Sequence, residues 1–242
     1  MKSITNSVLT FFIVFLFASS ACTQNWGGSG ITGEGSKVTK TLDIDNFSGL
    51  ALAISADVHI KQGSSQSVKV EGQQNIIDNL KKEVKNGVWK VGFEKNVRKH
   101  EPVTIWVTVP SVSELSVSGS GSILGDNKFS NLGNLSLAIS GSGNIKFDSD
   151  SKNLEVAISG SGNMDLSGNT GASNMRISGS GDINAFDLTA STCDVKISGS
   201  GDSSVNVSDK LDVAIAGSGD VFYKGRPSVR SKVSGSGSVE SK

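Results

Sequence analysis

Acidic and amide side chains recur after a small-residue motif in the C-terminal half of the sequence. The motif Ser/Ala-Gly-Ser-Gly is followed by Asn144, Asn163, Asp182, Asp202 and Asp220, at intervals of 18 to 20 residues. Their oxygens are of the kind that binds Ca²⁺, and glycine-rich turns that end in Asp hold calcium in repeats that recur about every nine residues. Calcium at the three aspartates is therefore one hypothesis, but the motif recurs only half as often here. We favour the other, in which these five residues, here called the Asx row, cap the backbone at turns.

Aromatic side chains form a second candidate site. Trp89, Phe93 and Trp106 lie near the charged loop 95–101. Exposed aromatic rings stack on sugars or on partner proteins, and buried rings close the end of a hydrophobic core. The sequence allows a ligand patch made of these three residues, and burial in the core is the interpretation that we favour.

Catalytic chemistry would have to come from a few scattered groups. His59 lies on the outward phase of an expected strand, and His100 lies in the charged loop. Asp148, Asp150 and Asp165 are surface carboxylates of neighbouring repeats that could lie close together in space. Glycoside hydrolysis requires such a pair of carboxylates. The sequence contains no motif for a nucleophile elbow, a phosphate-binding loop or a metal-ligand cluster. A carbohydrate-active enzyme is therefore the alternative, and a non-catalytic protein is the main expectation.

The N-terminal residues have the order of an export signal. A lysine precedes the apolar run 8–18, and small residues lead to Cys22. The run is shorter than the ~18 residues of a membrane-spanning helix, and a cysteine after Ser-Ser-Ala resembles the lipidation site of bacterial lipoproteins. We predict a signal peptide over residues 1–21, lipidation at Cys22 and a flexible tether over residues 22–37. The lipid would hold the protein at the cell envelope, on the outer membrane facing the periplasm or the cell surface.

The elements that carry the Asx row are short strands of one repeat. Seven copies of the Gly-Ser-Gly motif are separated by 22 residues once and by 18 to 20 residues thereafter. Apolar residues alternate on both sides of each copy, as in Leu135, Leu137 and Ile139 before the motif and Ile145 and Phe147 after it. This alternation indicates half-buried strands and excludes a disordered Gly/Ser linker.

The repeat period predicts how these strands are joined. Strands this close together leave no room for helical crossovers, but a chain that coils back over itself places equivalent residues about 4.8 Å apart. We predict an all-β parallel β-helix, or β-solenoid, with 18 to 20 residues per coil over repeats 116–240. An antiparallel β-sandwich is the rival fold.

The N-terminal half of the folded part predicts a cap on this solenoid. Residues 50–60 match the repeat at LAIS but lack the glycine motif, as expected for a divergent first coil. Residues 76–84 have helical spacing over one or two turns or belong to a strand, Asn86-Gly87 predicts a hairpin, and 103–109 alternates as a strand. We predict one domain over residues 38–242.

Charge and cysteine content narrow the possible partners. The chain has 23 basic and 23 acidic residues and no basic block, so nucleic acid is not an expected partner. Cys193 lies in an apolar alternation and is expected to be a small buried hydrophobe. With Cys22 assigned to the anchor, we expect no disulfide.

The sequence resembles a known family at several points in the same order. They are the lipoprotein-like start, ISADVHIKQG followed by SVKVEG, the passage VTIWVTVPSVSELSVSGSG, and the repeated ISGSG[N/D]. The chain is similar here to the putative auto-transporter adhesin, head GIN domain proteins of Bacteroidota-type cell envelopes. The resemblance implies a right-handed β-helix and an adhesive or envelope role.

These observations predict a non-catalytic envelope lipoprotein. It would act as an adhesin or scaffold that binds a glycan or another envelope protein through a polar face of the solenoid. The alternative is a β-helical polysaccharide lyase or hydrolase. We expect no cofactor, apart from the calcium hypothesis.

Overall fold

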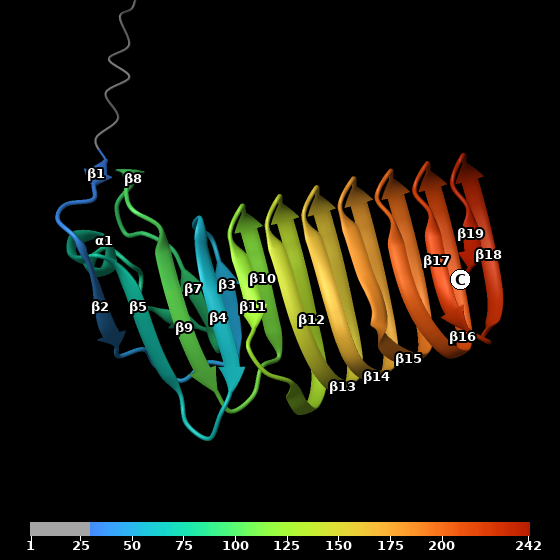
Figure 1. Ribbon diagram of the computed structural model, residues 1–242, viewed down its shortest axis with the longest axis horizontal. Coiled ribbons are helices and arrows are strands. Elements are labelled where there is room, and N and C mark those ends of the chain that lie inside the picture. Colours follow the sequence, from blue (N-terminus) through green and yellow to red (C-terminus); the bar gives the residue numbers. More distant parts are fainter. Residues whose placement is uncertain (1–29) are drawn as a thin grey trace, which may run out of the picture.

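The protein is a β-solenoid with a cap at its N-terminal end (Figure 1). The structure is a computed structural model that describes residues 30–242, and the predicted signal peptide and Cys22 lie outside these residues. No helix among the described residues has the length and apolar character needed to cross a membrane.

The strands of the solenoid pair in parallel with the equivalent strands of the next coil, as predicted. Leu135 lies opposite Leu154, and Gly141 lies opposite Gly160. The antiparallel sandwich is therefore excluded as the fold of the repeats. The solenoid strands are β3 (Gly49–Leu52), β4 (Ala56–Gln62), β10 (Glu114–Gly119), β11 (Ser122–Gly125), β12 (Phe129–Gly141), β13 (Asn144–Gly160), β14 (Asn163–Gly179), β15 (Asp182–Gly199), β16 (Ser203–Gly217), β17 (Val221–Gly225), β18 (Ser228–Gly235) and β19 (Val239–Ser241).

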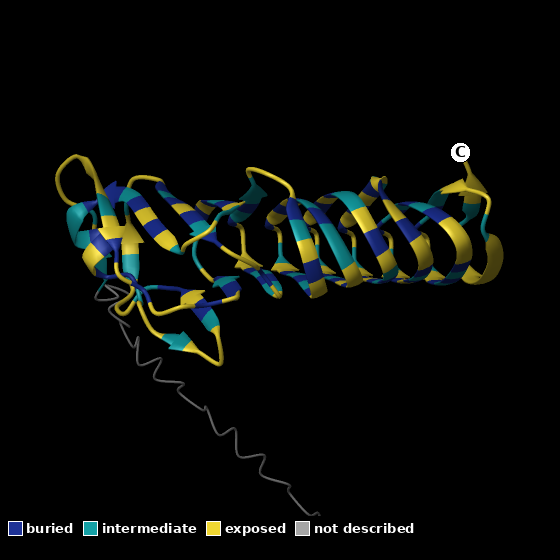
Figure 2. Cartoon of the chain, turned by 90° about the horizontal axis from the view of Figure 1, so that it is seen from below, coloured by how far each residue is buried: buried dark blue, intermediate teal, exposed yellow. Residues whose placement is uncertain are grey.

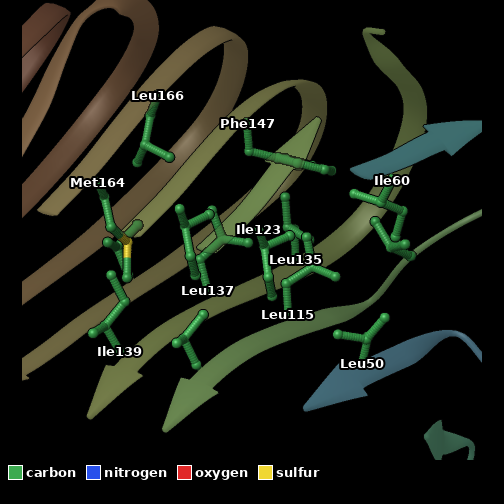
Figure 3. Packing of buried hydrophobic residues seen from close by; sticks show 14 of the residues in the cluster. Leu50, Ile60, Leu115, Ile123, Leu135, Leu137, Ile139, Phe147, Met164 and Leu166 are labelled. Carbon is green, nitrogen blue, oxygen red and sulfur yellow. The ribbon is translucent and has the colours of Figure 1, made fainter. Parts of the chain in front are cut away.

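Each coil has two walls that enclose a hydrophobic core. Wall 1 follows the Gly-Ser-Gly corner, as in residues 144–150, and wall 2 precedes the next corner, as in residues 154–160. Figure 2 shows the resulting bands of buried and exposed residues. Figure 3 shows side chains such as Leu137 and Phe147 in the interior. Each fully buried side chain of this size contributes about 1.5–3 kcal/mol, so stacking of the coils is the main source of stability.

The two glycines of a corner share one role and differ in another, since both lie close to the preceding coil and only the first turns the chain. The first glycine takes a positive φ, for example 125° at Gly141, which turns the chain from wall 2 into wall 1. The second glycine packs closely, since a Cβ on Gly143 would lie 2.5 Å from the carbonyl oxygen of Gly121. Each corner thus combines a bend in the chain with a close approach to the preceding coil.

The first coil is the divergent one that the sequence predicts. β3 pairs in parallel with β10, and β4 pairs in parallel with β11, so residues 50–60 enter the stack in register without a glycine corner. β9 (Val103–Val109) extends the wall formed by β4, also in parallel.

The remaining cap elements are antiparallel or irregular. In chain order these elements are β1 (Ile31–Thr32), β2 (Lys37–Leu42), β5 (Ser67–Gln73), α1 (Gln74–Asp78), β6 (Val84–Lys85), β7 (Val88–Val91) and β8 (Val97–Lys99). β5 pairs antiparallel with both β2 and β9. Positive φ angles of 52° at Asn86 and 75° at Gly87 join β6 to β7, which confirms the predicted hairpin.

The folded part begins before residue 38. Ile31 of β1 pairs with Val97 of β8, and the Gly33 amide donates to the Lys99 carbonyl at 2.8 Å. The prediction of a tether up to residue 37 is therefore wrong for residues 31–37, because backbone pairing with a distant strand holds this Gly-rich segment.

Candidate functional site

The outer surface of wall 2 forms a long groove lined by small side chains. Equivalent outward positions of successive coils carry the same residue types, including Ser118, Ser140, Ser159, Ser178, Ser198 and Ser234. A neighbouring row contributes Ala138, Ala157 and Ala214. The groove, called here the Ser/Ala groove, has a volume of about 890 Å³.

Charged side chains also line this groove. Arg176, Lys196 and Lys232 occupy the same row as the alanines, in other coils. The Arg176 guanidinium lies 3.0 Å from Glu155, and the Lys196 ammonium lies 2.9 Å from Asp194. The groove therefore presents serine hydroxyl groups and alanine methyl groups, and its small side chains let a ligand come close to the backbone. Because these groups continue over several coils, the groove suits an extended ligand rather than a compact one.

The Asx row lies at the start of wall 1, and its hydrogen bonds change along the solenoid. In the early coils the Asn163 amide side chain donates to the Asn144 side chain at 3.5 Å, and the Asn163 backbone N–H donates to the Gly143 carbonyl at 3.2 Å. In the later coils the acceptor is a carboxylate. The Asp202 backbone N–H donates to Asp182 at 2.8 Å, and the Asp220 N–H donates to Asp202 at 2.7 Å.

This pattern gives the aspartates a structural role. Each carboxylate accepts the backbone N–H of the next coil, and a charged acceptor makes a stronger hydrogen bond than a neutral one. The expected capping within the local turn is thus replaced by capping between coils. Within residues 30–242, no three or more His, Cys, Asp or Glu side chains gather as a metal site would require.

The three aromatic residues of the expected ligand patch do not come together. Trp89 is fully buried, and its ring packs 5.6 Å from that of Phe47. Phe93 is partly buried against the core, with its ring 5.7 Å from that of His100. Only Trp106 is exposed, at 36%. The patch is wrong as a group because β7 turns Trp89 inward to stack on β3, whereas β9 turns Trp106 outward.

Sequence reasoning missed the partners of His59. Its Nδ1 lies 2.9 Å from a carboxylate oxygen of Asp126, and its ring stacks beside Trp106. Asp126 is 67 residues away in the sequence. The signal that could have found it is the match between residues 50–60 and the repeat, which places the end of β4 beside the end of β11.

The outward carboxylates separate into two groups. Asp148 and Asp165 line a pocket of about 310 Å³ together with Asp187. Asp150 is bound elsewhere, 2.7 Å from the Lys128 ammonium, and this hydrogen bond lowers the pKa of Asp150 below its usual value. Of the three aspartates that the sequence offered as a pair of catalytic carboxylates, Asp148 and Asp165 line the same pocket, and Asp150 does not.

Comparison with solved structures shows that other proteins share the fold. A putative adhesin from Bacteroides fragilis has a TM-score of 0.81 at 23% identity, over 88% of this chain and 100% of its own. A putative lipid binding protein from Parabacteroides distasonis has a TM-score of 0.74 at 26% identity, again over 88% and 100%. A putative adhesin from Parabacteroides merdae has a TM-score of 0.70 at 22% identity, over 88% and 99%.

The sequence itself matches a family model over residues 46–227, from just before β3 to just after β17. No curated protein matches it. The adhesin-like description of the family suggests a location at the cell envelope or cell surface. The matched range contains the first coil, β9 and the repeats as far as β17, so the chain belongs to the family described as putative auto-transporter adhesin, head GIN domain.

Proposed function

We propose that the protein is a non-catalytic envelope lipoprotein that acts as an adhesin or scaffold, and that it holds a glycan or another envelope protein in the Ser/Ala groove. The observation that carries this proposal is the repetition of one outward surface over successive coils. Ser140, Ser159 and Ser178 lie in register on neighbouring strands. A ligand with its own repeat meets the same chemistry at each step.

The groove suits weak contacts that add up along an extended ligand. Neighbouring strands lie about 4.8 Å apart, so a polymer laid along the solenoid axis meets a new serine hydroxyl at each coil except the one that carries Ala216. Small residues such as Ala138 and Ala157 leave the surface flat enough for close approach. Linked contacts of this kind raise the overall affinity above that of any single one.

An N-terminal lipid would place this surface at the cell envelope. The export signal and the cysteine after Ser-Ser-Ala support lipidation at Cys22 and attachment to the outer membrane. The Gly-rich residues before β1 would then join the anchor to the cap, which lies at the opposite end of the molecule from the last coil (Figure 1). In this arrangement the groove extends away from the membrane.

The test is a substitution that fills the groove. Ala157→Arg adds a long charged side chain at an outward position of wall 2. The matched control is Asp165→Arg, an exposed outward position on wall 1. Both variants and the wild type are applied to an array of neutral, acidic and amino-sugar glycans, to isolated cell envelopes and to phosphatidylethanolamine vesicles.

We expect at least one glycan or envelope ligand whose binding Ala157→Arg abolishes and Asp165→Arg retains. If every ligand binds all three proteins equally, or if only the vesicles are bound, the groove is not the adhesive surface. The vesicles are included because the Parabacteroides distasonis protein of similar fold is described as lipid binding.

The pocket of Asp148, Asp165 and Asp187 is the observation that favours the alternative, a carbohydrate-active enzyme. Glycoside hydrolysis uses a pair of carboxyl groups that flank the bond to be cleaved. A screen of polysaccharides for new reducing ends, run with wild type and Asp165→Asn, separates the two functions. Our proposal expects no product from either protein, and product from the wild type alone would replace it with the enzyme.

A further inference from the structure

A second concave surface lies on the cap, on the outward face of the sheet formed by β2, β5, β9 and β4. Trp106 of β9 is at its centre, with Lys69 of β5 as the cross-strand neighbour on one side and His59 of β4 on the other. Lys61 lies opposite Thr108 in the same pair of strands. The pocket has a volume of about 460 Å³, within the usual range for small-ligand sites.

Trp106 presents an unusual amount of apolar surface to solvent. It is 36% exposed and is the only aromatic residue of 30–242 among the strongly exposed large hydrophobic side chains. The His59 ring stacks beside the indole, with 6.2 Å between centroids and 18° between planes. The His59 Nδ1 lies 2.9 Å from the Asp126 carboxylate, and this contact fixes the ring. The indole is held as a platform that nothing in the described fold covers.

The charges around the platform favour an anion. Lys61 and Lys69 are exposed, line the pocket and make no ion pair with any residue in 30–242. Some other surface lysines are paired, as Lys37 is with Glu71 at 2.6 Å and Lys128 is with Asp150 at 2.7 Å, and others are not, so the pocket is distinguished by having two unpaired lysines beside one exposed indole. Asp126 is the acidic residue of the pocket, and its carboxylate is engaged by His59.

Hydroxyl side chains complete the lining. Thr39, Ser67 and Thr108 come from three different strands and surround the indole and the two lysines. Hydroxyl groups donate and accept hydrogen bonds, so they match the hydroxyl groups of a sugar better than the chain of a lipid.

We propose that this cap pocket binds an acidic saccharide. The apolar face of a pyranose ring lies on the Trp106 indole, and the carboxylate or sulfate of the sugar is met by Lys61 and Lys69. Ring hydroxyls bond to Thr108, Ser67 and the Asp126 carboxylate. The site is separate from the Ser/Ala groove on wall 2, and it does not depend on the function proposed for that groove.

The experiment measures binding of defined oligosaccharides by calorimetry. The probes are oligogalacturonate, which carries carboxylates, a heparin-derived oligosaccharide, which carries sulfates, and cellotetraose, which is neutral. Inorganic sulfate is the fourth probe. The variants are Lys61→Gln/Lys69→Gln, Trp106→Ala and Trp106→Phe, and the control is Lys82→Gln/Lys152→Gln, which removes two exposed lysine charges elsewhere.

We expect one acidic oligosaccharide to bind, with the carboxylated and sulfated probes identifying the anionic group. The double glutamine variant and Trp106→Ala each weaken binding about tenfold or more, equal to at least ~1.4 kcal/mol. Trp106→Phe keeps most of the affinity because it keeps an aromatic platform. The lysine control and Ala157→Arg in the groove leave the affinity unchanged, so this site and the groove can fail separately.

Four results would overturn the proposal. They are equal binding of cellotetraose, inorganic sulfate competing as well as the oligosaccharide does, affinity unchanged in the double glutamine variant, and no binding of any saccharide. The lysine double variant alters exposed side chains only, so it remains decisive if Trp106→Ala fails to fold.

Discussion

The first glycine of each corner holds a backbone conformation that other residues rarely adopt. At Gly160 φ is 128°, and a Cβ there would also collide with the carbonyl oxygen of Gly141 in the preceding coil. Strain in this region costs about 1–3 kcal/mol for a residue with a side chain. A single methyl group at a corner therefore opposes both the turn and the stacking of coils.

The change Gly160→Ala should lower the free energy of unfolding by about 2 kcal/mol or more, from backbone strain and the clash together. Urea unfolding followed by circular dichroism measures it. Gly133→Ala is the matched control, because a Cβ at Gly133 meets nothing within 4 Å. Equal stability of the two variants would contradict the role given to the corner.

Cys193 supplies a prediction about pH. Burial raises the pKa of its thiol from 9.0 to about 11. Above pH 9.0 the Cys193 thiol of the unfolded chain loses its proton, whereas the thiol of the folded chain keeps it. The stability that the buried neutral thiol contributes is therefore fully present below pH 9 and is lost as the pH rises toward 11. The loss amounts to about 2 to 3 kcal/mol.

The measurement is the free energy of unfolding between pH 8 and pH 11, in wild type and Cys193→Ala. The difference between the two proteins should shrink or reverse as pH rises, because only the wild type contains the thiol. A constant difference across this range would show that burial does not control the thiol.

At the scale of elements, the Asx row shows how one position changes its bonding while the coil stays the same. Where Asn163 follows the corner, the acceptor for its backbone N–H is the Gly143 carbonyl, and where Asp202 follows it, the acceptor is the Asp182 carboxylate. Ser238, in the last coil, donates its N–H to Asp220 at 2.6 Å. The aspartates replace a backbone contact by a side-chain contact, and this accounts for them without a cation.

We therefore expect that neither chelation nor addition of calcium changes the thermal stability of the protein. Thermal unfolding after treatment with a chelator and again after addition of excess calcium should give the same Tm in both states. A Tm that rises clearly with calcium, and that no longer does so in Asp202→Asn, would establish the calcium hypothesis at Asp182, Asp202 and Asp220 instead.

The sequence predicted the elements that repeat better than those that do not. Alternation around Leu135 and Phe147 fixed which side chains face inward, and the period fixed the partner of each strand, as in Leu135 opposite Leu154. The antiparallel arrangement of β2, β5 and β9 has no repeat to reveal it. His59 and Asp126 are 67 residues apart and meet because β4 pairs in parallel with β11, so only the match between residues 50–60 and the repeat could have revealed this contact.

At the scale of the whole molecule, two surfaces with different chemistry lie on different parts of one sheet. The Ser/Ala groove follows wall 2 along the repeats, and the cap pocket lies around Trp106 on the other wall. The sequence predicted a polar solenoid face without indicating the wall that carries it, and the groove adds alanine methyl groups to its serine hydroxyls. The cap pocket was not predicted, because Trp89 and Phe93 resemble Trp106 in the sequence and only the pairing of strands shows which ring is exposed.

The length of the ligand distinguishes binding along the groove from binding at one point. Seven coils spaced by about 4.8 Å extend over roughly 30 Å. A ligand in the groove gains contacts with each coil that it reaches, and a ligand in the cap pocket gains none beyond the first one or two sugars.

The most direct test of binding along the groove is the affinity for an array-selected glycan as a function of its chain length, measured by calorimetry with wild type and Ala157→Arg. We expect that affinity for the wild type rises with length until the oligomer extends over roughly 30 Å, that Ala157→Arg removes the rise, and that the glycan is recovered intact. An affinity that is already maximal for one or two sugars and is unchanged in Ala157→Arg, or a glycan recovered in fragments, would rule out non-catalytic binding along the groove.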